Sequence, residues 1–529
     1  MYLLHRFRLV TMAILGSILK NGIKLSAVAE KEKTSPENQQ HKELRKLLTI
    51  AKSTAFGTKF QFAKILKQGK DVNSTYQAYK TNVPIYNYNK IFDEWWKQSK
   101  DGKSDVCWPG KINYFALSSG TSEASTKHIP ITIEILNANK KTGIKQIKSL
   151  SKYNLPDKLF TKGILMLGGS TELNKCGHYF EGDLSGIQVS KIPLWFQKFY
   201  KPGKAIAKNR DWTNKLKEIT LEAPKWDIGY LVGVPAWIQI MMEDIISHHK
   251  LNNIHEIWPN LEVFTHGGVS FEPYKKSFEK LLGKPLTYIE TYLASEGFIA
   301  YQSRPKAAGM KMVLNNGIFF EFIPFTEANF DDNGDLLENP ETLMIHQVEA
   351  NKPYALLLST CAGTWRYLIG DVIKFVDLTK SEIVICGRTK HFLSLCGEHL
   401  SVDNMNKAIN LTSEKLGISI KEFAVSGINY QSMFAHKWYV GVEGEADAQV
   451  IKETLDANLK ELNDDYKTER ISALKEVFVE VLPVDTFYAF LKAKGKEGGQ
   501  NKFPRVLKNV QLSDWELYLK ENGFISRTQ

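Results

Sequence analysis

The chain of 529 residues is poor in cysteine and lacks long apolar runs. Its five cysteines stand far apart and form no CxxC pair: Cys107, Cys176, Cys361, Cys386 and Cys396. This spacing argues against a zinc site or a disulfide framework, and reduced thiols in a cytosol are expected. Beyond the N-terminal region, no run approaches the about twenty apolar residues that span a bilayer. The sequence thus predicts a cytoplasmic protein without a membrane span.

Internal repeats, low-complexity tracts and nucleic-acid motifs are also missing. Apolar residues make up 43% and aromatic residues 11% of the chain, as in folded globular proteins. Its length suffices for two or three domains. The 69 basic and 58 acidic residues give a net charge of +11, with the lysines scattered along the chain. This modest excess is compatible with an anionic substrate such as a nucleotide, and no nucleic-acid partner is expected.

The first thirty residues allow two interpretations. A basic start precedes an apolar run over residues 9–19, and Ala27-Val28-Ala29 imitates a cleavage site, so the segment resembles a signal peptide. However, Lys20 and Lys24 interrupt the path to that site, and the apolar residues recur at helical spacing. We expect a helix over residues 3–24, with a cleaved signal as the alternative.

Four hydroxyl side chains and a glycine stand together between two strand-like runs, residues 114–117 and 128–132. The cluster and the lysine that follows it are Ser118, Ser119, Gly120, Thr121, Ser122 and Lys127. Hydroxyls, backbone N–H groups and a lysine suit a phosphate, and glycine lets the backbone approach it. A Walker loop would open a helix directly, whereas here a helix is expected only near Ile133. The alternative is an ordinary polar hairpin turn.

The pattern of apolar residues divides the rest of the chain into three parts. Strands and helices alternate over residues 160–297, which predicts an α/β arrangement with a largely parallel sheet. Short strands follow and predict a β-meander or small barrel, with strands over 311–314, 319–323, 343–347, 354–359 and 372–376. The last ~130 residues alternate again and predict a smaller α+β domain.

Two further stretches place polar residues where a nucleotide could meet them. Residues 290–297 end a strand in Tyr292, Ser295 and Glu296, and such residues at the carboxyl edge of a sheet face the ligand crevice. The alternative is a helix capped by Ser295. An aspartate on a strand, Asp371 after Gly370, can accept both hydroxyls of a ribose, although Gly-Asp is commoner in turns.

Two basic stretches complete the set. Residues 386–392 contain Arg388 after a glycine and have the composition of a hinge, or alternatively of a tight turn with solvated charges. Residues 494–505 contain three glycines and end in Lys502 and an arginine. A lysine on a mobile loop can neutralise charge that develops in a transition state, whereas the alternative is a basic surface loop.

In this order, the stretches resemble the auxin-responsive acyl-acid amido synthetase family, within the acyl-adenylate-forming superfamily. The resemblance covers about residues 30–510 and is carried by SSGTSEASTKHIP, FTHGGVSFEPY, ETYLASEGF, TCAGTWRYLIGDVIKF and GGQNKFPR. It implies the α/β fold of adenylate-forming enzymes. A large N-terminal α/β domain with a β-barrel-like part would occupy residues 1–388. A smaller, mobile C-terminal α+β domain would occupy residues 389–529.

The resemblance also implies two half-reactions. A carboxylic acid and ATP with Mg²⁺ would give an acyl-adenylate and pyrophosphate, and an amino acid amine would then take the acyl group and release AMP. The partners would be these small molecules, and a monomer is expected. The acceptor could instead be a thiol such as coenzyme A, or the chain could be a nucleotide-binding pseudoenzyme. The sequence names neither the acid nor the amino acid.

Roles carried over from the family fall on the residues singled out above and on residues of the motifs that carry the resemblance. The phosphates would be bound by Ser118, Ser119, Gly120, Thr121, Ser122 and Lys127. The adenine would lie among His266, Gly267, Gly268, Val269, Thr291 and Tyr292. Beside Ser295, Glu296 would orient Mg²⁺ or the α-phosphate; Asp371 would bind the ribose and Arg388 would lie near the hinge. Lys502 would bridge the acyl carboxylate and the α-phosphate as the catalytic lysine.

The sequence departs from the family pattern near Trp438. The family usually has an acidic residue before this tryptophan, where this chain has His436 and Lys437. The departure concerns the amino acid acceptor rather than the adenylation.

Overall fold

The structure is a computed structural model. It describes residues 34–118, 127–192, 196–268, 271–331, 334–389, 392–398, 400–494 and 503–525. Described residues up to Thr389 form a large unit, and those from Phe392 onward form a small unit. The helix expected over residues 3–24, with its alternative as a signal, lies outside these ranges. None of the described helices is long and apolar enough to cross a membrane.

The large unit is built on one mixed sheet. Its eleven strands, counted over the described residues, have the order β12-β13-β14-β15-β11-β10-β9-β8-β7-β3-β6. Their bounds are β3 Gly163–Met166, β6 Tyr200–Lys201, β7 Ile228–Gly233, β8 Val263–Gly267, β9 Thr287–Ala294, β10 Gly297–Tyr301, β11 Met310–Met312, β12 Ile318–Pro324, β13 Pro353–Thr360, β14 Thr364–Asp377 and β15 Glu382–Arg388. From β6 to β9 the neighbours pair parallel, which confirms the α/β prediction.

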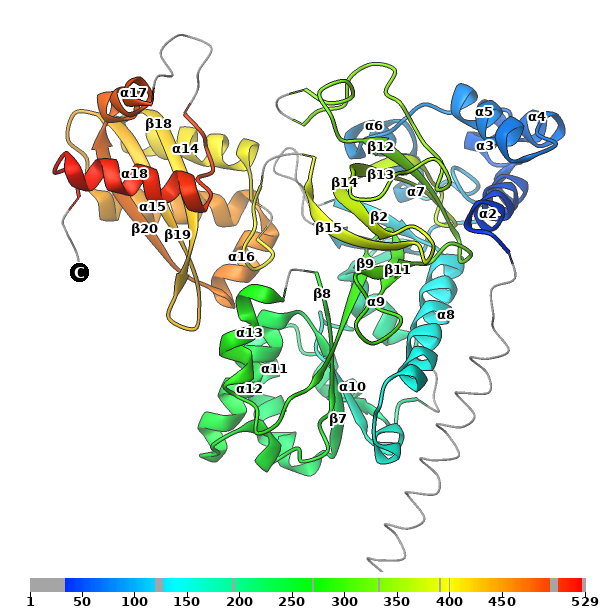
Figure 1. The fold of residues 1–529 in the computed structure, drawn as a ribbon, viewed down its shortest axis with the longest axis horizontal. Coiled ribbons are helices and arrows are strands. Elements are labelled where there is room, and N and C mark those ends of the chain that lie inside the picture. The colour runs from blue at the N-terminus through cyan, green and yellow to red at the C-terminus, as the bar shows by residue number, and fades with distance from the viewer. Residues whose placement is uncertain are drawn as a thin grey trace, which may run out of the picture. The chain divides into compact units, whose positions relative to one another are not determined.

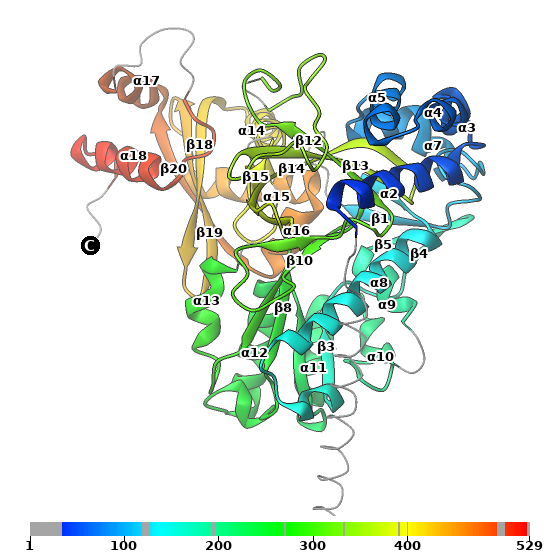
Figure 2. The ribbon, with the colours of Figure 1, turned by 45° about the vertical axis from the view of Figure 1, so that its right-hand side comes forward.

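Helices cover both faces of the parallel half. Figures 1 and 2 show α11, α12 and α13 on one face and α8 on the other. Their bounds are α8 Ile133–Ser149, α11 Trp212–Glu222, α12 Pro235–His249 and α13 Glu272–Glu279. The Thr132 side chain caps α8 by accepting from the Ile135 amide, and a proline opens α12, as a first helical turn tolerates. Strands buried on both faces read as continuous apolar runs, as β7 does.

The antiparallel half contains the predicted meander, formed by β12, β13, β14 and β15. It does not close into a separate barrel, because β15 pairs with β11 and continues into the rest of the sheet. The strand predicted over 343–347 is wrong. Leu343 makes only an isolated bridge to Phe322, and the Gln347 side chain accepts from the Met344 amide at 2.8 Å, which closes a turn.

A second sheet in the large unit holds the hydroxyl-rich stretch. It has the order β2-β1-β5-β4, with bounds β1 Tyr114–Ser118, β2 Lys127–Ile131, β4 Asn174–Cys176 and β5 Tyr179–Gly182. β1 and β2 pair antiparallel, and their last pair is Ser118 opposite Lys127. The prediction of two strands that flank the hydroxyl cluster is therefore confirmed, as is the helix beginning at Ile133.

Short helices complete the large unit. Their bounds are α2 Pro36–Ala51, α3 Ala55–Lys59, α4 Phe62–Gln68, α5 Val72–Asn82, α6 Tyr88–Ile91, α7 Lys97–Lys100, α9 Leu184–Ser190 and α10 Lys204–Ala207. Buried side chains of the first of these, including Leu44 and Leu47, join the core of the antiparallel half. The N-terminal helices thus belong to the same core as the meander.

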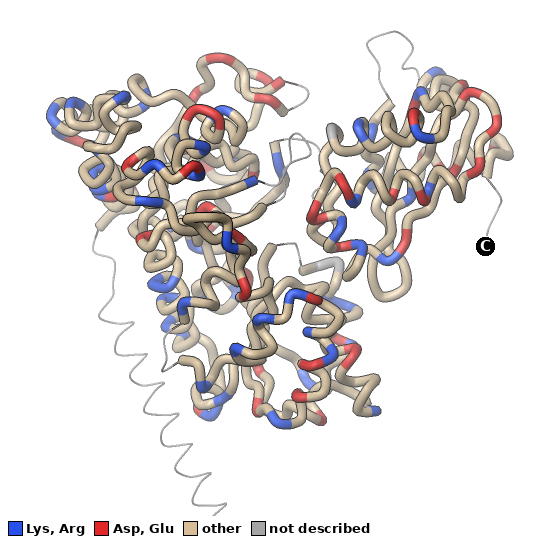
Figure 3. Tube along the Cα trace, turned by 180° about the vertical axis from the view of Figure 1, so that it is seen from behind, with Lys and Arg blue, Asp and Glu red and all other residues tan. Residues whose placement is uncertain are grey.

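The small unit is the predicted α+β domain. Its main sheet has the order β18-β19-β20, and β16 pairs with β17. The strands are β16 Phe392–Leu393, β17 Leu400–Ser401, β18 Ser419–Tyr430, β19 Met433–Glu443 and β20 Leu474–Pro483. The helices are α14 Val402–Leu416, α15 Ala448–Leu462, α16 Asp464–Ile471, α17 Val484–Ala493 and α18 Asn509–Glu521. Figure 3 shows basic and acidic residues interspersed along the traces of both units.

A buried hydrogen bond ties the start of the small unit to its sheet. Glu398 accepts from His436 Nε2 at 2.9 Å, and both side chains are fully buried. Burial alone would raise the pKa of Glu398, but His436 and the amides of Cys396 and Leu395 lower it to about 2. Because the ordinary value is 4.5, the pair stabilises the fold above that pH, and the stabilisation is lost as the pH falls through 2.

We predict that Glu398→Gln lowers the free energy of unfolding of the small unit by about 3 kcal/mol, because His436 would lose its partner in a buried site. Hydrogen exchange of the β19 amides measures this loss. Glu443→Gln, at the exposed end of the same strand, is the matched control and should cost less than about 1 kcal/mol. Equal losses in the two variants would contradict the prediction.

Candidate functional site

The site centres on the Asp371 carboxylate. β14 and β15 place Asp371 directly opposite Arg388, whose Nε donates to Asp371 Oδ1 at 2.6 Å. The Tyr292 hydroxyl, on β9, donates to the other carboxylate oxygen. Asp371 is buried and lies inside a continuous strand, so the alternative of a turn aspartate is wrong. Arg388 ends β15, and its charge is paired with Asp371 rather than solvated. Residues 390 and 391 of this stretch lie outside the described ranges, so the choice between a hinge and a tight turn stays a prediction.

In the contact between Tyr292 and Asp371, the tyrosine is the donor and the carboxylate is the acceptor. Burial and the negative charge of Asp371 raise the pKa of Tyr292 well above its ordinary value, so its hydroxyl stays protonated and donates. A carboxylate offers about four lone-pair sites, and Arg388 and Tyr292 use two of them. The remaining sites can accept from two neighbouring hydroxyl groups of a ligand. The geometry therefore suits a vicinal diol such as that of a ribose.

Glu296 occupies the tight turn between β9 and β10. Ala294 pairs with Gly297, so Ser295 and Glu296 form a two-residue hairpin loop. The alternative of a helix capped by Ser295 is wrong, because the chain returns at once as β10. Glu296 is only 7% exposed. The sequence motif located this carboxylate correctly at the end of a strand.

The charges around Glu296 link it to the rest of the site. Burial raises its pKa, as does Asp371, whereas the positive charges of Lys127 and Arg388 lower it. These four charged groups therefore act on one small region. Within the described ranges no group of three His, Cys, Asp or Glu side chains could hold a metal by itself. A magnesium ion at Glu296 would take its other ligands from water and phosphate oxygens, as Mg²⁺ usually does.

The end of β8 supplies a flat backbone surface beside β9. Gly267 lies opposite Thr291, and a side chain at Gly267 would meet the Thr291 carbonyl oxygen at 2.5 Å. Thr291 Oγ1 in turn donates to the His266 carbonyl at 3.0 Å. Gly268 has a φ of +85°, which turns the chain away after the strand. The glycine at position 267 is thus needed for the close approach of β9.

His266 is a neutral imidazole in this surface. Its side chain lies against the Phe271 ring, with centroids 4.8 Å apart, and burial lowers its pKa to about 4. Nδ1 has no hydrogen-bond partner among the residues that the structure describes. The ring can therefore contact an apolar or aromatic ligand without bringing a charge to it.

Two tyrosines near the site were missed in the sequence. Tyr367 lies on β14 before Asp371, and its buried hydroxyl interacts electrostatically with Glu296 and Arg388. Tyr88 accepts from the His128 amide at 2.8 Å, and the Lys127 ammonium lies 5.4 Å from its ring centroid. An aromatic residue in a strand or helix predicts core, so neither gave a separate signal.

Several predicted site residues lie outside the described ranges: Ser119, Gly120, Thr121, Ser122, Val269 and Lys502. Their roles stay predictions. The described members of the predicted set fall into two groups, the charged cluster around Asp371 and the backbone surface at the end of β8. Arg505, the last residue of the basic stretch 494–505, donates to the Phe423 carbonyl at 2.9 Å and thus has a structural role.

Comparisons with known proteins match one family along most of the chain. The GH3 family N-terminal domain matches residues 26–222 and 235–287, the central domain 311–388 and the C-terminal domain 403–511. The indole-3-acetic acid-amido synthetase GH3.10 of Arabidopsis thaliana is 24% identical over 49% of this chain and 47% of its own. The jasmonoyl–L-amino acid synthetase JAR4 of Nicotiana attenuata is 27% identical over 49% of this chain and 46% of its own. The match thus spans about half the length of these relatives.

Solved structures share the fold over nearly the whole chain. An AtGH3.15 acyl acid amido synthetase in complex with 2,4-DB has a TM-score of 0.56 at 16% identity, covering 96% of both chains. A 2-hydroxyisobutyryl-CoA ligase with 2-HIB-AMP and CoA has a TM-score of 0.55 at 12% identity, covering 92% of this chain and 93% of its own. The fold of adenylate-forming enzymes, with its large and small domains, is thereby confirmed.

The neutral His266 predicts a pH dependence of stability. An unfolded histidine titrates near 6.5 and this one near 4, so folding loses up to about 3 kcal/mol as the pH falls from 6.5 to 4. His266→Phe should remove that part of the loss, measured by urea unfolding at pH 7 and pH 4.5. His178→Phe, at an exposed histidine, is the control and should leave the dependence unchanged. An identical pH dependence in wild type and His266→Phe would refute the assignment.

Proposed function

Because the chain belongs to the GH3 family, we propose that it is an ATP-dependent acyl-acid amido synthetase. It activates a carboxylic acid as the acyl-adenylate, with release of pyrophosphate, and transfers the acyl group to an amino acid amine, with release of AMP. The observation that carries the proposal is the buried Asp371 carboxylate, held by Arg388 and Tyr292 beside Glu296. This arrangement has the hydrogen-bonding capacity for a ribose, and Glu296 offers a carboxylate for a Mg²⁺ ion that would offset the charge of the phosphates.

In this proposal the nucleotide spans the two groups of the site. The ribose hydroxyls donate to Asp371, and the adenine lies on the backbone surface of Gly267 and Gly268, near Tyr292. Glu296 holds Mg²⁺, whose charge offsets that of the phosphate oxygens. Lys127 and the hydroxyls from Ser118 to Ser122 bind the phosphates.

The chemical step needs positive charge on the α-phosphate. Attack by the acid's carboxylate places negative charge on the phosphoryl oxygens as pyrophosphate leaves, and Lys502 neutralises it. Lys502 belongs to the small domain, whose rotation near Arg388 would bring the lysine to the site for adenylation and remove it for amide formation. The two half-reactions would thus use one nucleotide site in turn.

The group that accepts the acyl chain in the second half-reaction could be a thiol instead of an amine. The similar fold of a CoA ligase leaves a thiol acceptor as an alternative, because the first half-reaction is the same for both. In the small unit, His436 is fully buried and paired with Glu398, so it does not present a charge to an incoming amino acid. Amine capture would then depend on other residues.

The first experiment is ATP–pyrophosphate exchange with Mg²⁺ and a panel of aryl, indolyl and fatty acids. We expect exchange that depends on one class of acid, followed by AMP release when amino acids are added. Product analysis with an amino acid and with coenzyme A distinguishes the two acceptors. ATP binding without exchange for any acid would instead support the pseudoenzyme.

Asp371→Asn should raise the KM for ATP by about 10- to 100-fold, because the ribose would lose a charged acceptor and Arg388 would lose its partner. The initial rate of exchange against ATP concentration measures the change. Asp377→Asn, at the far end of the same strand and paired with Lys380, is the matched control and should leave the KM unchanged. An unaltered KM in Asp371→Asn would rule out the ribose role.

A further inference from the structure

Tyr88 lies against the hairpin of β1 and β2, where we propose that the phosphates of the nucleotide bind. It is the first residue of α6, and its side chain is buried. Its hydroxyl oxygen accepts from the His128 amide at 2.8 Å, and the Lys127 ammonium nitrogen lies 5.4 Å from its ring centroid. Tyr88 therefore contacts two successive residues of β2, one through the hydroxyl and one through the ring.

The contact with the His128 amide holds an edge strand. β2 stands at one end of its sheet, counted over the described residues, and an edge strand has N–H groups that no neighbouring strand can bind. The Tyr88 hydroxyl supplies the missing acceptor for His128. This amide follows directly after the last pair of the hairpin, Ser118 opposite Lys127. The hydroxyl thus holds β2 in place beside Lys127.

The ring of Tyr88 offers the Lys127 ammonium an aromatic face. Their separation of 5.4 Å is within the about 6 Å of a cation–π contact. Burial raises the pKa of Tyr88 to about 12, so its hydroxyl stays uncharged at neutral pH. Because the lysine stem is flexible, a contact with a fixed ring limits the directions in which the ammonium group can point. That group also interacts electrostatically with Glu296.

Tyr88 can position another side chain because its own ring is fixed. The Phe92 ring stacks on it with centroids 5.5 Å apart, and the Trp96 ring meets it edge-on at 6.2 Å. Trp96 in turn lies 5.6 Å from the ring of Tyr367 on β14, the strand that carries Asp371. Phe92 and Trp96 begin and end a π-helical turn, a rare element that is frequent at functional sites. The row of rings thus extends from β2 to β14.

We propose that Tyr88 is a positioning residue that sets the place of Lys127 in the nucleotide site. The proposal rests on the function proposed above, in which Lys127 binds a phosphate of ATP. Tyr88 acts through Lys127 and contacts no reacting atom. Its hydroxyl holds the strand from which the lysine extends, and its ring directs the ammonium group. Loss of the ring should therefore weaken ATP binding only in a protein that still has the lysine.

The test is a double-mutant cycle on the Kd for ATP with Mg²⁺, measured on the full chain by competition against a fluorescent ATP analogue. Tyr88→Phe removes the hydroxyl and keeps the ring, whereas Tyr88→Leu removes both. Each is made alone and together with Lys127→Met. With Lys127 present, Tyr88→Leu should bind ATP about 3- to 10-fold more weakly than Tyr88→Phe. Combined with Lys127→Met, the two variants should differ by less than about twofold.

A second measurement needs no nucleotide. Hydrogen exchange of the His128 amide should become at least about tenfold faster in Tyr88→Phe, because this N–H would lose its acceptor. Tyr79→Phe is the matched control, since it removes another buried tyrosine hydroxyl, which is hydrogen-bonded to Ser359 at 2.7 Å. It should leave both the exchange of His128 and the Kd for ATP unchanged. Melting temperatures establish that each variant is folded.

A loss of equal size with and without Lys127 would overturn the proposal, because Tyr88 would then act by packing alone. Unchanged exchange of His128 in Tyr88→Phe, or the same increase in Tyr79→Phe, would overturn it as well. Pyrophosphate exchange by the wild type separates this role from the proposed function. If exchange depends on an acid and the cycle fails, only the role of Tyr88 is refuted. If the cycle holds and no acid supports exchange, only the synthetase is refuted, and a wild type that does not bind ATP refutes both.

Discussion

The contact between Tyr292 and Asp371 constrains the whole large unit. In the sheet order, β9 and β14 are separated by β10, β11 and β15, so a flat sheet would hold them about 19 Å apart. Their side chains are nevertheless hydrogen-bonded. The antiparallel half must therefore curl back over β9. Its short strands are curved like part of a barrel, but the sheet does not close into one. The charged cluster around Asp371, where we propose that the nucleotide binds, lies at this contact.

The same contact explains why the site lies at β9. On one side β9 pairs parallel with β8, and on the other it pairs antiparallel with β10. The residues of the proposed site thus stand where the pairing changes from parallel to antiparallel. The parallel side contributes backbone at Gly267, and the antiparallel side contributes charged side chains at Glu296 and Asp371. A nucleotide needs both, because its base is planar and its ribose and phosphates are polar.

The sequence singled out side chains that meet around Asp371 but did not give their geometry. Tyr292, Glu296, Asp371 and Arg388 were found because each stands in a short stretch whose residue types suit a nucleotide. Whether Ser295-Glu296 caps a helix or turns a hairpin was open, since serine and glutamate suit both and only pairing with β10 decides. The strand predicted over residues 343–347 is absent because a side-chain hydrogen bond closes a turn there, and the spacing of apolar residues gives no sign of such a bond. Tyr367 was missed because burial makes it indistinguishable from core.

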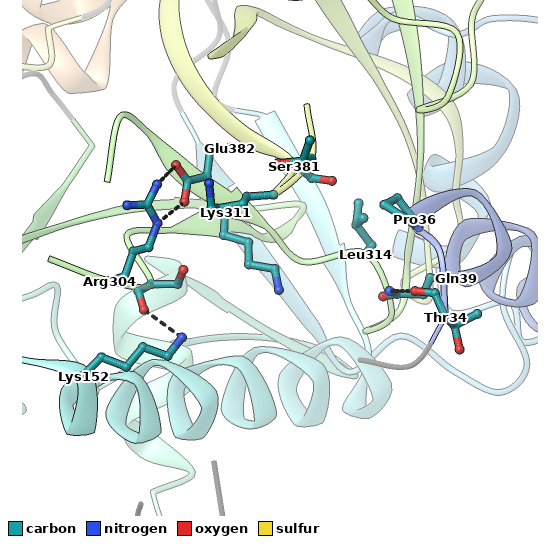
Figure 4. Close-up of a pocket in the computed structure, with 12 residues that line it drawn as sticks. Thr34, Pro36, Gln39, Lys152, Arg304, Lys311, Leu314, Ser381 and Glu382 are labelled. Atoms are coloured by element: carbon teal, nitrogen blue, oxygen red, sulfur yellow. Dashed lines mark hydrogen bonds and ion pairs between the residues drawn. The ribbon is translucent and has the colours of Figure 1, made fainter. Parts of the chain in front are cut away.

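A cavity of about 310 Å³ in the large unit shows a further limit of sequence reasoning and its physical cause. Its residues come from segments near positions 36, 152, 304 and 380, which converge on it in Figure 4, and none of these segments has an unusual composition by itself. Only the curled sheet brings them together, and there Arg304 forms two hydrogen bonds with Glu382. The curvature that brings Tyr292 to Asp371, next to one end of β15, thus also shapes the cavity at the other end of that strand.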